Sequence, residues 1–173
     1  MSKLSPSSLA IAVWGVGGVI VLVGQAIWRL LPLALEPLLD GSMSSFQLGL
    51  YFGWTLFNAY AEGYRGFQRS FSPRVVGRAL HLARHPRPLF VVLAPAFCMA
   101  LFHAKRKNLI LAWAVLALVI AAITLVRFLP QPWRGIVDAG VVIGLIWGMA
   151  SLILIFVLAL TRNTAPEHDS LPA

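Results

Sequence analysis

The chain has 173 residues, of which 59% are hydrophobic and only 12% are charged. Ordinary soluble proteins carry about 25% charged residues, so this composition excludes a soluble globular fold and indicates an integral membrane protein. The net charge of +8 does not indicate nucleic-acid binding, because the basic residues lie in short stretches beside apolar segments. There they set topology and attract anionic lipid headgroups.

The first apolar segment runs from residue 9 to residue 28 and contains no charge. A helix of about 20 apolar residues is long enough to cross the hydrocarbon core of a bilayer. We therefore predict an uncleaved first span, with Trp28 and Arg29 marking its far interface. Residues 30–39 contain two prolines and one acid. We expect them to rest at that interface before the next span begins.

The second predicted span, residues 44–64, has a polar seam along one helical face. Its members follow at offsets of four, three and four residues: Tyr51, Thr55, Asn58 and Glu62. Gly49 and Gly53 lie on the opposite side of the helix. We expect both the seam and the glycine face to contact protein more than lipid, since small and polar residues mark helix–helix interfaces in membranes.

Glu62 is the strongest single functional candidate in the sequence, because an ionisable group inside a span is costly and usually has a partner. It could carry protons or bind a cationic group. A more ordinary role is an ion pair within the helix with Arg65 or Arg69, which lie at or near pairing distance. We favour the ion pair.

The stretch from residue 64 to residue 88 holds six of the fourteen lysines and arginines. Ser72-Pro73 is typical of a helix start, and His85-Pro86 is typical of a helix end. Apolar residues recur at helical spacing between them, which predicts a basic amphipathic helix over 72–85 that lies in the membrane interface. We assign the basic interfacial face to Arg65, Arg69, Arg74, Arg78, His81, Arg84, His85 and Arg87.

Metal and cofactor binding receive little support. His81 and His85 stand one turn apart and could offer two nitrogens to a metal, but His103 is the one further candidate ligand. Cys98 is the single cysteine and lies in an apolar run, so we interpret it as a buried, inert thiol. We assign no metal site and no cofactor.

The apolar segment 89–103 is interrupted by Pro95 and is marginal for a full crossing. It is followed by two clear spans, residues 109–126 and 136–160. We treat residues 1–163 as one helical transmembrane domain, followed by a polar tail over 164–173.

Two topologies compete. Five full spans place 9 basic residues on the cytoplasmic side and 5 on the far side, whereas four spans with a re-entrant or half-spanning 89–103 segment give 11 against 3. The positive-inside rule favours the second arrangement. We therefore predict an all-α protein of a bacterial-type plasma membrane, with four spans, the interfacial helix, and both the N-terminus and the basic loop in the cytoplasm.

The last span carries a double GxxxG pattern formed by Gly140, Gly144 and Gly148, which allows two helix backbones to approach closely. Its partner is either another helix of this chain or a second subunit. Near the start of the span, Arg134 and Asp138 are four residues apart and are expected to form an ion pair.

No phosphate-binding loop, nucleophile elbow or zinc-protease motif is present in the sequence. The leading hypothesis is an accessory or scaffold subunit that packs against other membrane subunits, or against itself, through its glycine faces. A second hypothesis is an oligomeric transporter or channel subunit that uses the polar seam. A third, weaker one is a membrane enzyme that acts on lipid headgroups through the basic face.

Overall fold

In the computed structural model, 85% of the described residues are helical. The structure describes residues 5–162, and no β-strand occurs among them. Within that range, three helices are long and apolar enough to cross a membrane, namely α1, α6 and α7. The predictions of an all-α fold and of membrane-spanning helices are confirmed at this level. The helices are α1 (Pro6–Leu39), α2 (Ser45–Asn58), η1 (Ala59–Phe71), α3 (Ser72–Arg84), α4 (Pro88–Val92), α5 (Ala94–Cys98), α6 (Arg106–Val126) and α7 (Trp133–Arg162).

Helix α1 is longer than the predicted span. Ser5 caps its first turn by accepting from the Ser8 amide at 3.2 Å, and Pro6 suits the first helical position because its missing N–H would have no partner there. The helix then continues through Pro32 and Pro37 to Leu39. Residues 30–39 are therefore an extension of the first helix and not a separate interfacial segment.

The second long element is one uninterrupted helix composed of α2, η1 and α3. Ser44 begins it with a capping box, in which Gln47 accepts from the Ser44 amide at 2.9 Å. The middle part, η1, is a π-helix. The α-helical part α3 begins at Ser72, as predicted, but it continues directly from η1. Ser72 does not cap it, and its hydroxyl pairs instead with Ser151 of α7 at 3.0 Å. The predicted end is confirmed, since His85 terminates the helix.

Helix α3 lies in the core of the protein. Val75, Val76 and Ala79 are almost completely buried, and α3 packs against α1, α5 and α7. The expectation of a surface helix with an exposed basic face is therefore wrong for Arg74 and Arg78, which are 8% and 1% exposed. The amphipathic pattern identified one buried face correctly, but α5 covers the opposite face as well.

Residues 89–103 do not form a single long helix. They fold into α4 and α5, two helices of five residues each, and neither is long enough to cross a bilayer. α5 packs against α1, where Cys98 and Pro95 fill the space beside Gly15 and Gly18.

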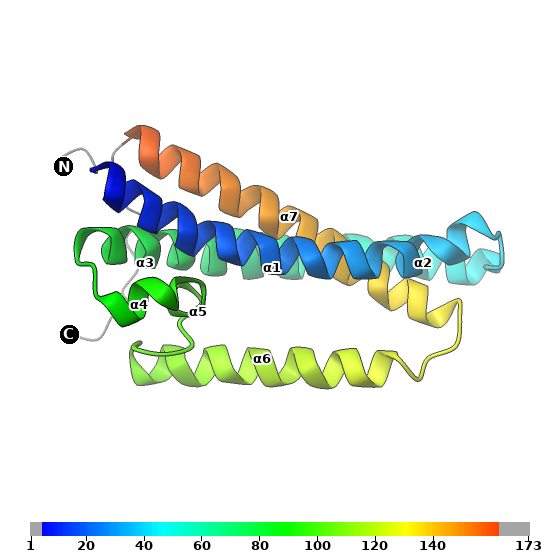
Figure 1. Cartoon of the computed structure of the whole chain (residues 1–173). Helices are drawn as coiled ribbons and strands as arrows, with labels where there is room; N and C mark the ends of the chain where they lie inside the picture. Colours follow the sequence, from blue (N-terminus) through cyan, green and yellow to red (C-terminus); the bar gives the residue numbers. More distant parts are fainter. Residues whose placement is uncertain (1–4, 163–173) are drawn as a thin grey trace.

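Figure 1 shows how the elements are arranged. α1, α7 and the continuous helix from α2 to α3 lie along one another, while α6 is set apart from them. The start of α1, the end of α3, the start of α6 and the end of α7 share one end of the molecule. The predicted tail, residues 164–173, lies outside the described residues.

Candidate functional site

The π-helical segment η1 concentrates polar and charged residues beside the middle of an apolar helix. Gly63 of η1 packs against Trp147, and Phe67 packs against Gly148, both near the centre of α7. On the sides of η1 that do not face α7, Arg65 and Arg69 are exposed, and Glu62 is exposed beside Gly144 of α7. These charges therefore lie level with the middle of a helix that is long and apolar enough to span a membrane.

The π-helical geometry influences which side chains line up. Each N–H in a π-helix bonds to the carbonyl five residues back, so the turn is wider than in an α-helix and residues four apart stay close to one line. Glu62, Gly66, Ser70 and Arg74 follow at this spacing. The last two are in contact, since Arg74 donates to the Ser70 hydroxyl at 3.2 Å. π-Helical turns are rare and often occur at functional sites.

Glu62 does not have the ordinary partner that its spacing predicts. In the part of the chain that the structure describes, Glu62 forms no ion pair with Arg65 or Arg69. Its carboxylate lies beside α7 instead, where a methyl group added at Gly144 would be 3.1 Å from Oε2. Arg69 stacks over the Tyr64 ring, with Cζ 5.8 Å from the ring centroid.

The other members of the polar seam are engaged within the protein. Tyr51 donates its hydroxyl to the Ala34 carbonyl at 3.1 Å, Thr55 donates to the Tyr51 carbonyl at 2.7 Å, and Asn58 donates to the Trp54 carbonyl at 2.8 Å. Tyr51 and Asn58 are buried. This part of the seam is thus a packed, hydrogen-bonded surface, and Glu62 is its one charged and exposed member.

The glycines of α7 allow α2 and η1 to approach closely. A methyl group at Gly140 would lie 2.6 Å from Asn58 Nδ2, and one at Gly148 would collide with the Phe67 ring. Real carbon contacts are longer, so these positions need glycine. Gly49 and Gly53 differ, because no atom lies within 4 Å of a methyl group placed at either one. A protein contact at Gly49 and Gly53 would therefore have to come from outside the described residues.

Arg78 is held by carbonyl groups of the chain itself. Its Nε donates to the Phe97 carbonyl at 2.6 Å, and its Nη2 donates to the carbonyls of Phe102 and His103 at 3.1 and 3.0 Å. Its Cζ also lies 4.1 Å from the centre of the Phe97 ring. Ala100 and His103 adopt positive φ angles of 62° and 48°, a strained conformation for residues with a side chain, within the turn that presents these carbonyls.

The remaining basic residues do not form one continuous face. Arg84, His85 and Arg87 are exposed at the end of α3, and the rings of His81 and His85 are 4.8 Å apart. Arg74 is buried, and its Nε has no hydrogen-bond partner among the described residues. Between residues 5 and 162, no group of three or more His, Cys, Asp or Glu side chains comes together to hold a metal.

At the opposite end of the molecule, Arg134 and Asp138 form an ion pair with Nε and Oδ2 3.5 Å apart. Asp138 is buried there. Gln131, which lies just before α7, donates to Glu36 of α1 at 2.7 Å. Gln131 also accepts from the Gly135 amide at 3.0 Å, so it ties the start of α7 to the end of α1, whereas the ion pair lies within α7.

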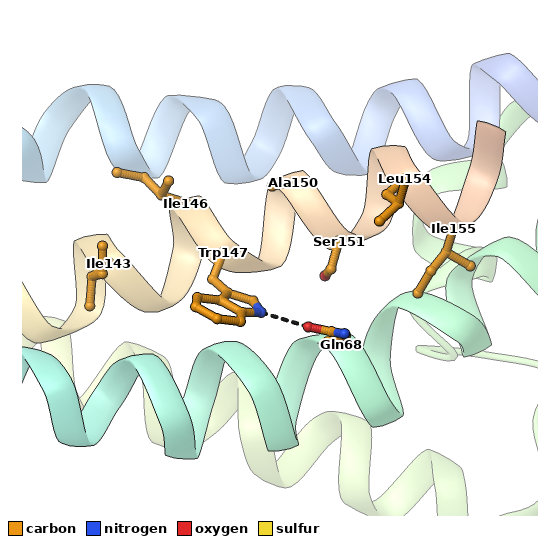
Figure 2. A pocket seen from close by; sticks show the side chains of 8 residues that line it. All are labelled: Gln68, Ile143, Ile146, Trp147, Ala150, Ser151, Leu154 and Ile155. Carbon is orange, nitrogen blue, oxygen red and sulfur yellow. Dashed lines mark hydrogen bonds between the residues drawn. The ribbon is translucent and has the colours of Figure 1, made fainter. Parts of the chain in front are cut away.

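A groove of about 360 Å³ runs along α7 beside η1. Its lining is apolar apart from Gln68, Trp147 and Ser151, and Figure 2 shows the Trp147 indole donating to the Gln68 amide oxygen, a distance of 2.8 Å. Ser151 donates to the Gly148 carbonyl at 2.9 Å. No charged side chain lines this groove, so it lacks the groups that an active site for polar chemistry requires.

Comparison with known proteins adds no relative: no family model matches the sequence, and no curated protein or solved structure matches it either.

Proposed function

We propose that this chain is a small multi-pass accessory or scaffold subunit of a bacterial-type plasma membrane, which packs against other membrane helices. The observation that carries this proposal is the exposed charge on η1. Glu62, Arg65 and Arg69 lie level with the middle of α7 and form no ion pair in the described chain. A charged residue at the centre of a membrane helix costs about 2.5–3.5 kcal/mol, so such residues normally face protein or a water-filled cavity and not lipid.

The distribution of charge supports the proposed topology. The end of the molecule shared by the start of α1 and the end of α7 carries exposed basic groups from three helices, among them Arg84, Lys107 and Arg162, and no acid in the described chain. The other end mixes basic residues with Glu36 and Asp138. By the positive-inside rule, the first end faces the cytoplasm. The helix from α2 to α3 then provides the fourth crossing, and α4 with α5 provides the short segment that returns to the same side.

The position of α6 also supports assembly with partners. Among the described residues, no other helix packs along it, and Ala112 is its one buried residue. The indole of Trp113 donates to the Leu101 carbonyl at 3.0 Å, which links the start of α6 to the turn after α5. A helix held away from its own bundle leaves room for the helices of another subunit on both sides.

The two alternative functions gain less support. A transport path along Tyr51, Thr55 and Asn58 is disfavoured because their donors are committed to backbone carbonyls. An enzyme that acts on lipid headgroups would need a pocket where the histidines and arginines converge. The described groove lies beside the middle of α7 instead, and His81 and His85 are exposed.

Affinity purification of the tagged full-length chain in mild detergent tests the proposal. We expect partner membrane proteins or further copies to co-purify with the wild type, and expect their yield to fall when Arg65 and Arg69 are both changed to alanine. The matched control changes Arg84 and Arg87 to alanine, a pair of exposed arginines at the end of the molecule. A wild-type chain that purifies as a monomer without any companion would contradict the proposal.

A further inference from the structure

One side of the helix formed by α2 and η1 has no neighbour among the described residues. Asn58, Glu62 and Phe67 lie on the side that packs along α7. On the side turned away from α7, residues four apart in the sequence follow one another from α2 into η1. We call this set the arginine face: Gly49, Gly53, Phe57, Ala61, Arg65 and Arg69. All of its members except the partly buried Ala61 are exposed.

The described residues offer no carboxylate to the two arginines of this face. Neither Arg65 nor Arg69 forms a hydrogen bond or an ion pair in the described range. Arg69 lies over the Tyr64 ring, a contact that leaves its N–H groups without an acceptor. Glu62 is near in sequence, but its carboxylate lies beside Gly144 of α7. The other described acids belong to the end of α1 and the start of α7: Glu36, Asp40 and Asp138.

The depth of the two arginines makes an acidic partner favourable. Gly63 packs against Trp147 and Phe67 packs beside Gly148, so Arg65, which lies between them in sequence, is level with the middle of α7. An arginine at this depth is costly to leave against lipid and is normally paired. A guanidinium forms two parallel hydrogen bonds with a carboxylate, which also neutralises its charge. A neutral partner would leave both charges uncompensated, and a basic partner would repel them.

The shape of the arginine face suits a helix. Nothing lies within 4 Å of a methyl group placed at Gly49 or Gly53. Small residues one turn apart let the backbones of two membrane helices approach closely. Because these glycines continue the line of Arg65 and Arg69, a helix that lies along the face contacts both the glycines and the arginines.

We propose that the arginine face binds a membrane helix of a different protein that carries a glutamate or aspartate at mid-membrane depth. The carboxylate pairs with Arg65 and Arg69, and the partner's backbone packs beside Gly49 and Gly53. This inference rests on the proposed role as an accessory subunit and names the chemistry of its partner.

Capture of a probe helix by the full-length chain tests the pairing. The probe is a tagged single span of about 22 leucine and alanine residues with one glutamate at its centre. A central glutamate reaches the depth of the arginines whichever way the probe inserts. Two matched probes carry glutamine or lysine at the same place. In mild detergent, the wild-type chain should capture the glutamate probe at least about tenfold better than the glutamine probe.

Reversing the charge of the face should reverse this preference. Arg65→Glu combined with Arg69→Glu should lose the glutamate probe and capture the lysine probe, and that gain also shows that the variant folds. The matched control is Arg84→Glu with Arg87→Glu, which reverses two exposed arginines at the end of the molecule. This control should capture the glutamate probe as well as the wild type does.

Cross-linking in native membranes locates the contact. In a Cys98→Ala background, Ala61→Cys lies one turn from Arg65 on the arginine face. On mild oxidation it should form a disulfide with a probe cysteine placed one turn before or one turn after the glutamate. Val115→Cys on α6, an exposed position on another helix, should not.

Three results would overturn the inference. The first is equal capture of the glutamate and glutamine probes by the wild type. In the second, differently tagged wild-type copies capture one another and the double reversal of Arg65 and Arg69 abolishes that capture, so that a second copy occupies the face. In the third, the glutamate probe is captured only after Glu167→Gln and Asp169→Asn, so that the chain's own acids occupy the face.

The probe experiment and the affinity purification fail independently. If the chain shows no preference for the glutamate probe but still purifies with companion membrane proteins, the inference about the acid is wrong and the accessory role stands. If the glutamate probe is captured selectively but the wild type purifies without any companion, the chemistry of the face stands and the accessory role is wrong.

Discussion

Arg69 and Arg78 belong to one continuous helix, yet their surroundings are opposite. Arg78 is 1% exposed and donates to three backbone carbonyls. Arg69, in contrast, is exposed, and its guanidinium lies over the ring of Tyr64. An arginine thus has a structural role at position 78 in α3, whereas the arginine at position 69 in η1 is available to a partner. The difference shows that an arginine in an apolar helix must be assigned a role from its acceptors, not from its position in the sequence.

The largest effect on stability is expected from replacing Arg78, the buried arginine. Arg78→Met should destabilise the protein by about 3–5 kcal/mol, because the carbonyls of Phe97, Phe102 and His103 lose their donor inside the core. Thermal unfolding in detergent, followed by tryptophan fluorescence, measures the loss. Arg84→Met, at an exposed position of the same helix, is the control. Arg78→Lys should recover part of the stability, since lysine keeps the charge but cannot reproduce the forked geometry. Equal stability of Arg78→Met and the control would refute the structural role.

A smaller effect is expected where η1 is held against α7. Gly148→Leu should cost about 1–3 kcal/mol, because the new side chain collides with the Phe67 ring and separates the two helices. Gly17→Leu is the matched control. It makes the same change in a long apolar helix, at a glycine where nothing lies within 4 Å of an added methyl group. Thermal unfolding of both variants in the same detergent gives the comparison. Similar losses at the two positions would show that η1 is not held by close packing.

The smallest effect on stability is expected from replacing the exposed arginines of η1. Arg65→Met combined with Arg69→Met should change the free energy of unfolding of the isolated chain by less than about 0.5 kcal/mol, as surface substitutions usually do. The same double variant should lose most of the membrane proteins that co-purify with the wild type. Unfolding of the isolated chain and affinity purification of the tagged chain measure the two effects separately. A large loss of stability would place these arginines in the same structural class as Arg78.

Several elements could be predicted from local sequence signals. The last two spans required only long apolar runs with basic residues at their ends, and the structure extends each of them by a few residues at its start or at both ends. His85 before Pro86 marked the end of a helix for a local steric reason. The spacing of Gly140, Gly144 and Gly148 likewise placed all three on one face, which the structure brings against α2 and η1.

The features that could not be predicted depend on contacts between distant residues. Ser72-Pro73 is a good local start signal, and α3 begins there, but the continuation of the helix from η1 was not visible, nor was the Ser72 hydroxyl's partner Ser151 on α7. Arg78 was assigned to an exposed face because its acceptors lie 19 to 25 residues further along the chain. The π-helical form of η1 has no recognised sequence signature, although its cluster of charged residues between apolar segments was visible.

The Arg78 contacts also have a consequence for the order in which the protein is made. A ribosome adds residues from the N-terminus, so this arginine is synthesised 19 residues before Phe97 and 25 residues before His103. During that interval the guanidinium has none of these carbonyl partners. The end of the helix from α2 to α3 therefore reaches its final surroundings only after the chain has been made through His103. A nascent chain that stops between Arg78 and Phe97 carries a guanidinium cation that its own backbone has not yet enclosed.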